Sequence, residues 1–174
     1  MRSNSWRLAE NVASLSPISL SAMEVEVVYE DILDDLAPCG LSCRKCFADT
    51  KGDIATLSTQ LLERLGGFDV YAERFSAFLP AFKDYPAFQG LLNYFAQGHC
   101  DGCRGGTCLY PNCGVTTCYR EKGVDFCFQC EEFPCDKTNF DPHLKRRWRQ
   151  MNRRMGKIGV EAYYEETRDQ PRYR

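Results

Sequence analysis

The sequence predicts a mainly helical fold: a small helical domain with a cysteine-rich segment that is dominated by loops. Two observations support this fold class. Apolar residues recur with helical spacing over 53–97 and again over 142–166. Between these stretches, residues 100–135 contain eight of the 11 cysteines, together with many glycines and few aliphatic residues. Such a segment buries too little apolar surface to offset its chain entropy, so something other than a hydrophobic core must fix its shape.

The 174 residues are enough for one domain with its own core and too few for two ordinary domains. Residues 1–22 are polar, serine-rich and without periodicity, which predicts a flexible leader. We expect a single domain over 23–166 and a frayed tail over 167–174. At the start of this domain, residues 25–29 alternate as in a short strand, and residues 31–36 suit one helical turn before Pro38.

Three helices are expected within 53–97. The first begins at Asp53 as N-cap, and Gly66-Gly67 ends it. The second covers 69–78, and the third runs from Pro86 to Gly98. Their apolar and aromatic side chains at helical spacing are expected to form the core, and a ligand pocket is the alternative. These side chains are Leu57, Leu61, Leu62, Leu65, Val70, Tyr71, Phe75, Phe78, Leu79, Phe88, Leu91, Leu92, Tyr94 and Phe95.

Two further helices are expected after residue 100. One is short and covers 115–122. The other covers 142–166, is weakened by Gly156 and Gly159, and closes the core with one apolar face.

Composition favours a cytoplasmic protein with reduced thiols. No apolar run resembling a signal peptide follows the first residues, and no stretch approaches the roughly 20 apolar residues of a membrane span. In that compartment, cysteines in Cys-x-x-Cys pairs are typical of metal ligands and not of disulfides. The net charge of −2 gives no overall attraction to nucleic acid or to an anionic membrane.

Two Cys-x-x-Cys pairs have the clearest ligand spacing, Cys100–Cys103 and Cys127–Cys130. A tight turn at each pair would aim two thiolates at one ion, and two such turns complete a tetrahedral zinc site with four cysteine ligands. Three cysteines lie in the loop between the pairs and suggest a second, nested site that Cys135 completes. These three are Cys108, Cys113 and Cys118.

Cys39, Cys43 and Cys46 form a third group, with the Cys-x3-Cys-x2-Cys spacing that holds the [4Fe–4S] cluster of radical S-adenosylmethionine enzymes. The helical pattern that follows and Lys45, at a position usually aromatic in that motif, favour zinc over this alternative. His99 and His143 are candidates for one additional ligand. We predict that all 11 cysteines ligate metal: Cys39, Cys43, Cys46, Cys100, Cys103, Cys108, Cys113, Cys118, Cys127, Cys130 and Cys135.

The order of these cysteines resembles that of a known family. The relevant stretches are Ala37-Pro38-Cys39-Gly40-Leu41-Ser42-Cys43-Arg44-Lys45-Cys46, Cys100-Asp101-Gly102-Cys103-Arg104, Glu121 to Cys127 and Glu132-Phe133-Pro134-Cys135. They are similar to the cysteine-rich prokaryotic family catalogued as domain of unknown function 3795, over roughly 37–165. The resemblance implies a small, mostly helical, zinc-binding domain without an established activity.

The sequence thus predicts a zinc-binding domain that serves as an interaction or regulatory module and is more consistent with a binding protein than with an enzyme. It contains no catalytic triad, His-Glu-x-x-His pair or phosphate-binding glycine loop. An iron–sulfur protein is one alternative. Another is nucleic-acid binding through residues 145–157, where seven of 13 side chains are basic. A protein partner is possible, and a membrane partner is not expected.

Overall fold

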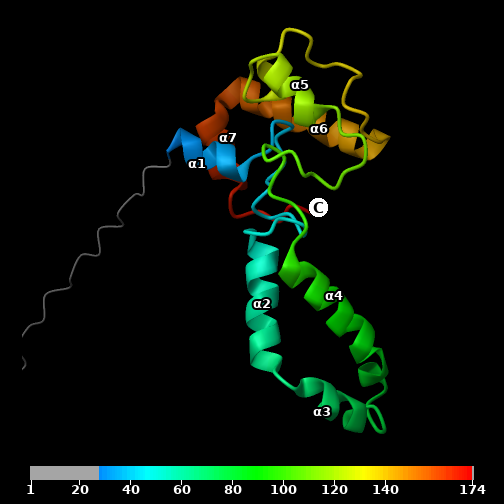
Figure 1. Cartoon of the computed structure of the whole chain (residues 1–174). Coiled ribbons are helices and arrows are strands. Elements are labelled where there is room, and N and C mark those ends of the chain that lie inside the picture. Colours follow the sequence, from blue (N-terminus) through cyan, green and yellow to red (C-terminus); the bar gives the residue numbers. More distant parts are fainter. Residues whose placement is uncertain (1–27, 174) are drawn as a thin grey trace, which may run out of the picture.

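The computed structural model describes residues 28–173, which form a body and a projecting helical arm (Figure 1). The arm, residues 53–97, contains α2 (Asp53–Leu65), α3 (Phe68–Phe75), the 3-10 helix η1 (Pro80–Asp84) and α4 (Tyr85–Gln97). The body contains α1 (Tyr29–Asp35), α5 (Val115–Glu121), the 3-10 helix η2 (Cys127–Gln129), α6 (Pro142–Ile158), α7 (Val160–Thr167) and the cysteine-rich loops. The predicted mainly helical class is confirmed. Over the described residues, pairing of extended backbone is limited to two isolated bridges.

The body is built around α6. Trp148 and Met155 on this helix are fully buried in two apolar clusters that share Met151, and Phe126 from the cysteine-rich segment is fully buried in the cluster of Met155. Around these three side chains pack residues from α1, α5, α7 and the loop after α1: Ile32, Leu36, Ala37, Leu41, Val115, Val160 and Tyr163. The core of this protein is therefore formed by α6 and its neighbours.

The prediction of one helix over 142–166 is wrong. Gly159 has φ +90° and ψ 161°, a backbone conformation essentially restricted to glycine, and it separates α6 from α7. Asp141 caps α6 by accepting from the backbone N–H groups of His143 and Leu144. The break lets α7 fold back on α6, so that Val160 and Tyr163 reach the same core as Met155.

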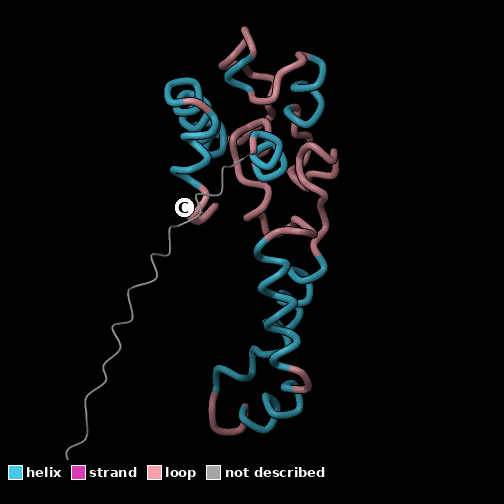
Figure 2. Tube along the Cα trace, turned by 90° about the vertical axis from the view of Figure 1, so that its left-hand side faces the viewer, coloured by secondary structure: helices cyan, strands magenta, loops and turns pink. Residues whose placement is uncertain are grey.

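The segments that flank the two ends of the arm are joined by backbone hydrogen bonds at its base. The backbone N–H of Thr50 donates to the carbonyl of Cys100 at 3.0 Å, and that of His99 donates to the carbonyl of Ala48 at 2.7 Å. Gly98 lets these two segments approach closely, because a Cβ at this position would lie 2.6 Å from the Cα of Thr50. From this base, α2 and α4 run side by side away from the body, and α3 closes the far end (Figure 2).

The expectation that the arm carries the core is wrong. Its helices are close to those predicted, but of the 12 large apolar side chains that are exposed among the described residues, nine lie in the arm. Helical periodicity correctly marks an apolar face, but nothing in the body covers it. Only a few arm residues are buried, among them Ala55, Tyr85 and Leu92 between the helices.

Smaller outcomes concern the ends of the helices and membrane spans. Gly52, not Asp53, occupies the N-cap position of α2. The predicted helical turn near 31–36 is confirmed as α1, whereas the strand predicted for 25–29 begins outside the described residues. No helix within 28–173 is long and apolar enough to cross a membrane.

Candidate metal centre

The cysteines form two neighbouring groups in the body. We call the first the neck cluster, since it lies at the base of the arm: Cys39, Cys43, Cys46, Cys100, Cys103 and Cys108. The second, beside α5 and α6, is the upper cluster: Cys113, Cys118, Cys127, Cys130 and Cys135. Two members lie between the groups, since Cys39 interacts electrostatically with Cys127 as well as Cys43, and Cys113 with Cys108 as well as Cys127. All 11 cysteines are free thiols. Within 28–173, no three His, Cys, Asp or Glu side chains are arranged closely enough around one point to form a finished metal site.

The neck cluster is organised by Cys103. Its backbone N–H donates to the Cys43 sulfur at 3.4 Å. The neighbouring Cys103 thiol lowers the pKa of Cys43 to about 7 and that of Cys108 to about 6, and the same interactions raise the pKa of Cys103. Cys100 is close enough to Cys108 and Cys43 to interact with both electrostatically. Four sulfurs from two chain segments are thus close together, and two of them favour the thiolate form that binds metal.

The upper cluster contains a cavity of about 30 Å³, which all of its cysteines except Cys113 line. Four cysteines from three segments line it, Cys118 on α5, Cys127 and Cys130 around η2, and Cys135 in the loop that follows. The volume exceeds the roughly 10–15 Å³ that one water molecule needs, so there is room for a single ion. Burial raises the pKa of Cys127 to about 11. A cation in the cavity would oppose that shift and stabilise the thiolate.

Trp148 closes the same cavity and carries an unsatisfied donor. Its indole Nε1 is buried with no hydrogen-bond partner at bonding distance. Burial raises the pKa of the nearby Cys127 thiol, and the indole N–H partly opposes that effect, although the two groups are not in hydrogen-bonding geometry. Buried donors are rarely left unpaired in native structures. A metal-bound Cys127 thiolate would supply the missing acceptor, so the residues of this cavity fit a cationic metal.

Two lysines lie close to the upper cluster. Lys122 and Lys137 line the cavity and interact electrostatically with Cys118. Glu132 bridges them through an ion pair with Lys122 and one of 2.6 Å to Lys137. Four thiolates around a divalent ion carry a net charge of −2, which the two lysines offset in part.

The structure pairs the cysteines differently from the spacing argument. Cys103 lies against Cys43 and Cys108, whereas Cys127 and Cys130 share their cavity with Cys118 and Cys135. The two Cys-x-x-Cys pairs therefore belong to different clusters, and the nested arrangement is not what the fold produces. Spacing identifies turns that aim two sulfurs together, but tertiary packing decides which turns meet.

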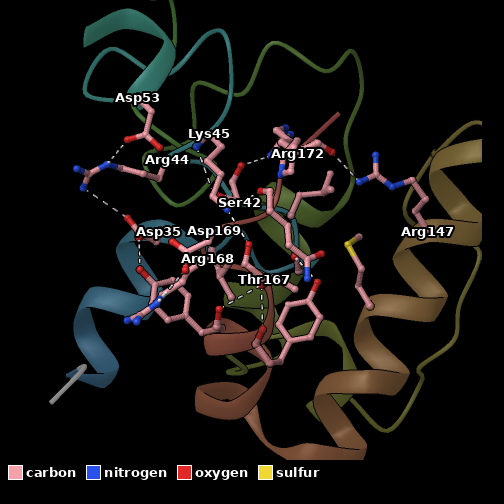
Figure 3. A pocket seen from close by; sticks show the side chains of 18 residues that line it. Asp35, Ser42, Arg44, Lys45, Asp53, Arg147, Thr167, Arg168, Asp169 and Arg172 are labelled. Carbon is pink, nitrogen blue, oxygen red and sulfur yellow. Dashed lines mark hydrogen bonds and ion pairs between the residues drawn. The ribbon is translucent and has the colours of Figure 1, made fainter. Parts of the chain in front are cut away.

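The C-terminal tail lies beside the neck cluster, next to a polar pocket of about 300 Å³ (Figure 3). Lys45 donates to the carbonyls of Thr167 and Gln170, at 2.7 and 2.8 Å, and Arg172 donates to the carbonyl of Ser42. The Tyr173 hydroxyl lies 3.7 Å from the Cys46 sulfur. The tail thus makes contacts with the 39–46 loop that the sequence did not predict.

Charged side chains around this pocket form ion pairs and hydrogen bonds with other residues of the protein. Arg44 bonds Asp53 at 3.0 Å and lies 3.8 Å from Asp35, while Arg147 donates to the carbonyl of Arg172 at 2.8 Å (Figure 3). These groups order the tail and the start of the arm. The pocket is therefore best described as a polar seam between body segments.

Neither candidate histidine adjoins a cysteine cluster through a contact of its side chain. His99 is exposed and its ring lies tilted against that of Tyr94, with centroids 4.0 Å apart. His143 is exposed in the first turn of α6. The basic segment 145–157 is partly neutralised, since Lys145 pairs with Asp136 and Arg154 pairs with Glu166.

A comparison of the sequence with protein families identifies the same family that the order of the cysteines suggests. Residues 35–140 match the model of a family described as protein of unknown function (DUF3795). The chain belongs to this family. The matched residues include both cysteine clusters and the whole arm. No curated protein and no solved structure shows significant similarity to the chain.

Proposed function

We propose that this DUF3795 protein is a zinc-binding interaction module whose cysteine clusters hold metal and thereby fix the arm on the body. The observation that carries the proposal is the upper cavity, which four cysteines line and an unsatisfied indole donor faces. Zinc is favoured because it binds four thiolates tetrahedrally and stabilises small folds in which loops predominate. The ligands proposed for this ion are Cys118, Cys127, Cys130 and Cys135.

A second zinc ion is proposed for the neck cluster, held by Cys43, Cys100, Cys103 and Cys108. The hydrogen bond from the backbone N–H of Cys103 to the Cys43 sulfur supports this set, because it joins the two chain segments, and the Cys103 thiol also interacts with Cys108. Metal binding would displace the thiol protons and release them to solvent. Cys46 lies beside Tyr173 and is not assigned to this ion.

Ligation at the neck would have a mechanical consequence for the arm. Cys43 lies nine residues before Gly52, the N-cap residue of α2, and Cys100 follows α4 after Gly98. An ion that joins these two segments would hold both ends of the arm at one point. It would add to the two backbone hydrogen bonds that already join the segments. Zinc sites closed by four cysteines have no open coordination position, so this role is structural and not catalytic.

The test is the metal content and absorption spectrum of full-length protein purified without oxygen. We expect about two zinc ions per chain and no visible absorbance, which follows from the filled d shell of zinc. Brown protein with stoichiometric iron and sulfide would overturn the zinc assignment and support an iron–sulfur centre. Protein that is fully folded without any metal would overturn the proposal as a whole.

A further inference from the structure

Arg104 joins the neck cluster to two other parts of the body. It directly follows Cys103, one of the ligands proposed for the neck ion. Its Nε donates to the carbonyl of Leu33 on α1 at 2.9 Å, and its Nη2 donates to the carbonyl of Asp125 at 2.8 Å. Because the planar guanidinium donates in two directions at once, this one side chain holds both carbonyls.

The same guanidinium lies against two aromatic rings. Its central carbon is 5.3 Å from the ring centroid of Tyr119 and 5.2 Å from that of Phe126, within the roughly 6 Å over which a cation is attracted to a ring face. Tyr119 directly follows Cys118 on α5, and Phe126 directly precedes Cys127. Arg104 therefore contacts the immediate neighbours of two ligands proposed for the upper ion.

The backbone of this segment is held from both sides as well. The carbonyl of Arg104 accepts a hydrogen bond from the guanidinium of Arg120, which lies two residues after Cys118 on α5. In the other direction, the backbone N–H of Cys103 donates to the Cys43 sulfur at 3.4 Å. The two residues 103 and 104 thus connect the neck cluster to the surroundings of the upper cluster.

A shared segment makes two binding events depend on each other. The cysteine-rich loops contain few aliphatic side chains, so fixing their backbone costs conformational entropy that metal binding must offset. An ion at the neck would fix Cys103 and, through Arg104, the residues next to Cys118 and Cys127. A second ion would then bind ligands that are already ordered, which raises its affinity.

We propose that Arg104 is a positioning residue that couples the two metal centres, so that an ion bound at one centre raises the affinity of the other. The inference rests on the proposed function, since it takes the two ions and their ligands from there. It adds a regulatory property, because the filling of one centre then depends on the filling of the other. Coupling between binding sites is reciprocal, so the effect is equal in both directions.

The test compares the zinc affinities of full-length proteins by competition with a chromophoric chelator. Cys43→Ser/Cys100→Ser removes two neck ligands and leaves the upper centre, and Cys118→Ser/Cys130→Ser does the reverse. Both double variants keep the cysteines next to Arg104 and Phe126. The coupling factor is the overall affinity of the wild type for two ions, divided by the product of the two single-centre affinities. We expect a factor of at least about five, at the lower end of the roughly 5–150-fold range that is typical of coupled sites.

Arg104→Met removes the guanidinium, and the factor measured again in this background should fall to about one. A purely structural role would weaken each centre by itself and leave the factor unchanged, so the factor is the decisive readout. The matched control is Arg153→Met, which removes the same group from an exposed position on α6 and should keep the wild-type factor. If Arg104→Met fails to fold, Arg104→Lys decides, because it keeps the charge without the planar fork and should also lower the factor.

A wild-type factor of about one, with two zinc ions bound, would overturn the coupling and leave the proposed function intact. Wild-type protein that binds no zinc would contradict the proposed function, and this inference with it. A factor that keeps its wild-type value in the Arg104 variant would overturn the role of this residue. At saturating zinc, each single-centre protein should still hold one ion, because coupling changes the affinity of a site and not the number of sites.

Discussion

Asn152 joins α6 to both cysteine-bearing loops, and its replacement tests that connection. The side chain is fully buried. Its Oδ1 accepts from the backbone N–H of Phe128 at 3.0 Å, and its Nδ2 donates to the carbonyl of Cys39 at 2.8 Å. The two loops that these bonds hold contain Cys127 and Cys39, so one amide positions residues of both clusters.

Asn152→Ala would leave the partly buried N–H of Phe128 and the buried carbonyl of Cys39 without these partners. Each unsatisfied group costs about 1–3 kcal/mol, so the free energy of unfolding should fall by about 2–6 kcal/mol. Since small domains are stable by only about 5–15 kcal/mol, this is a large fraction of the total. Urea denaturation followed by tryptophan fluorescence, at constant free zinc, measures the change.

Arg153→Ala is the matched control, because Arg153 is the exposed neighbour of Asn152 on the same helix. Its effect should stay within about 0.5 kcal/mol. If Asn152→Ala costs less than about 1 kcal/mol, the two loops are held by something else, and the assignment of Asn152 as their common support is refuted.

Three further predictions follow from particular contacts. Trp148→Phe keeps most of the buried ring and removes the indole N–H, so competition with a chromophoric chelator should show zinc in the upper cluster bound about 10–100-fold more weakly. Gly159→Ala should lower the free energy of unfolding by about 1–3 kcal/mol, since φ is +90° there. Gly90→Ala, at an open position within α4, should raise it by about 0.5–1 kcal/mol. Thermal melts in which both variants shift Tm in the same direction would contradict this. Burial and a hydrogen bond to Asp35 raise the pKa of Tyr164 to about 12, so the folded state favours the protonated phenol. Its contribution is therefore complete below the unfolded pKa of about 10 and is lost as the pH rises from there through 12, and Tyr164→Phe should flatten the decline of Tm over that window.

Much of the local structure could be predicted from the sequence. Helical spacing placed helices near α2, α3, α4, α5 and α6, and glycine and proline marked most of their ends. The exception at Gly159 has a clear cause: glycine in a helix is only mildly unfavourable, so the sequence indicates a weak point but not the fold-back that the packing of Val160 and Tyr163 on α6 selects.

Long-range packing could not be predicted in the same way. The apolar stripe of the arm looks like core in the sequence because periodicity reports which face avoids water and not which element covers it. Likewise, Cys-x-x-Cys spacing predicts turns that bring two sulfurs together, but whether Cys127 meets Cys103 or Cys118 depends on how the loops fold over α6. In the sequence, Trp148 is one apolar residue within the basic segment 145–157, and nothing in the spacing sets it apart. Its orphan indole donor beside Cys127 became visible with the side chains in place.

Counting zinc in two single variants and their double tests the central claim most directly. Cys130→Ser removes one ligand proposed for the upper cluster, and Cys103→Ser removes one proposed for the neck cluster. Measured by mass spectrometry of the native protein, each single variant should hold one zinc ion fewer than the wild type, and the double variant two fewer. If both variants lose the same ion, so that the double holds as much zinc as either single, the two clusters are not separate metal centres and the account is wrong.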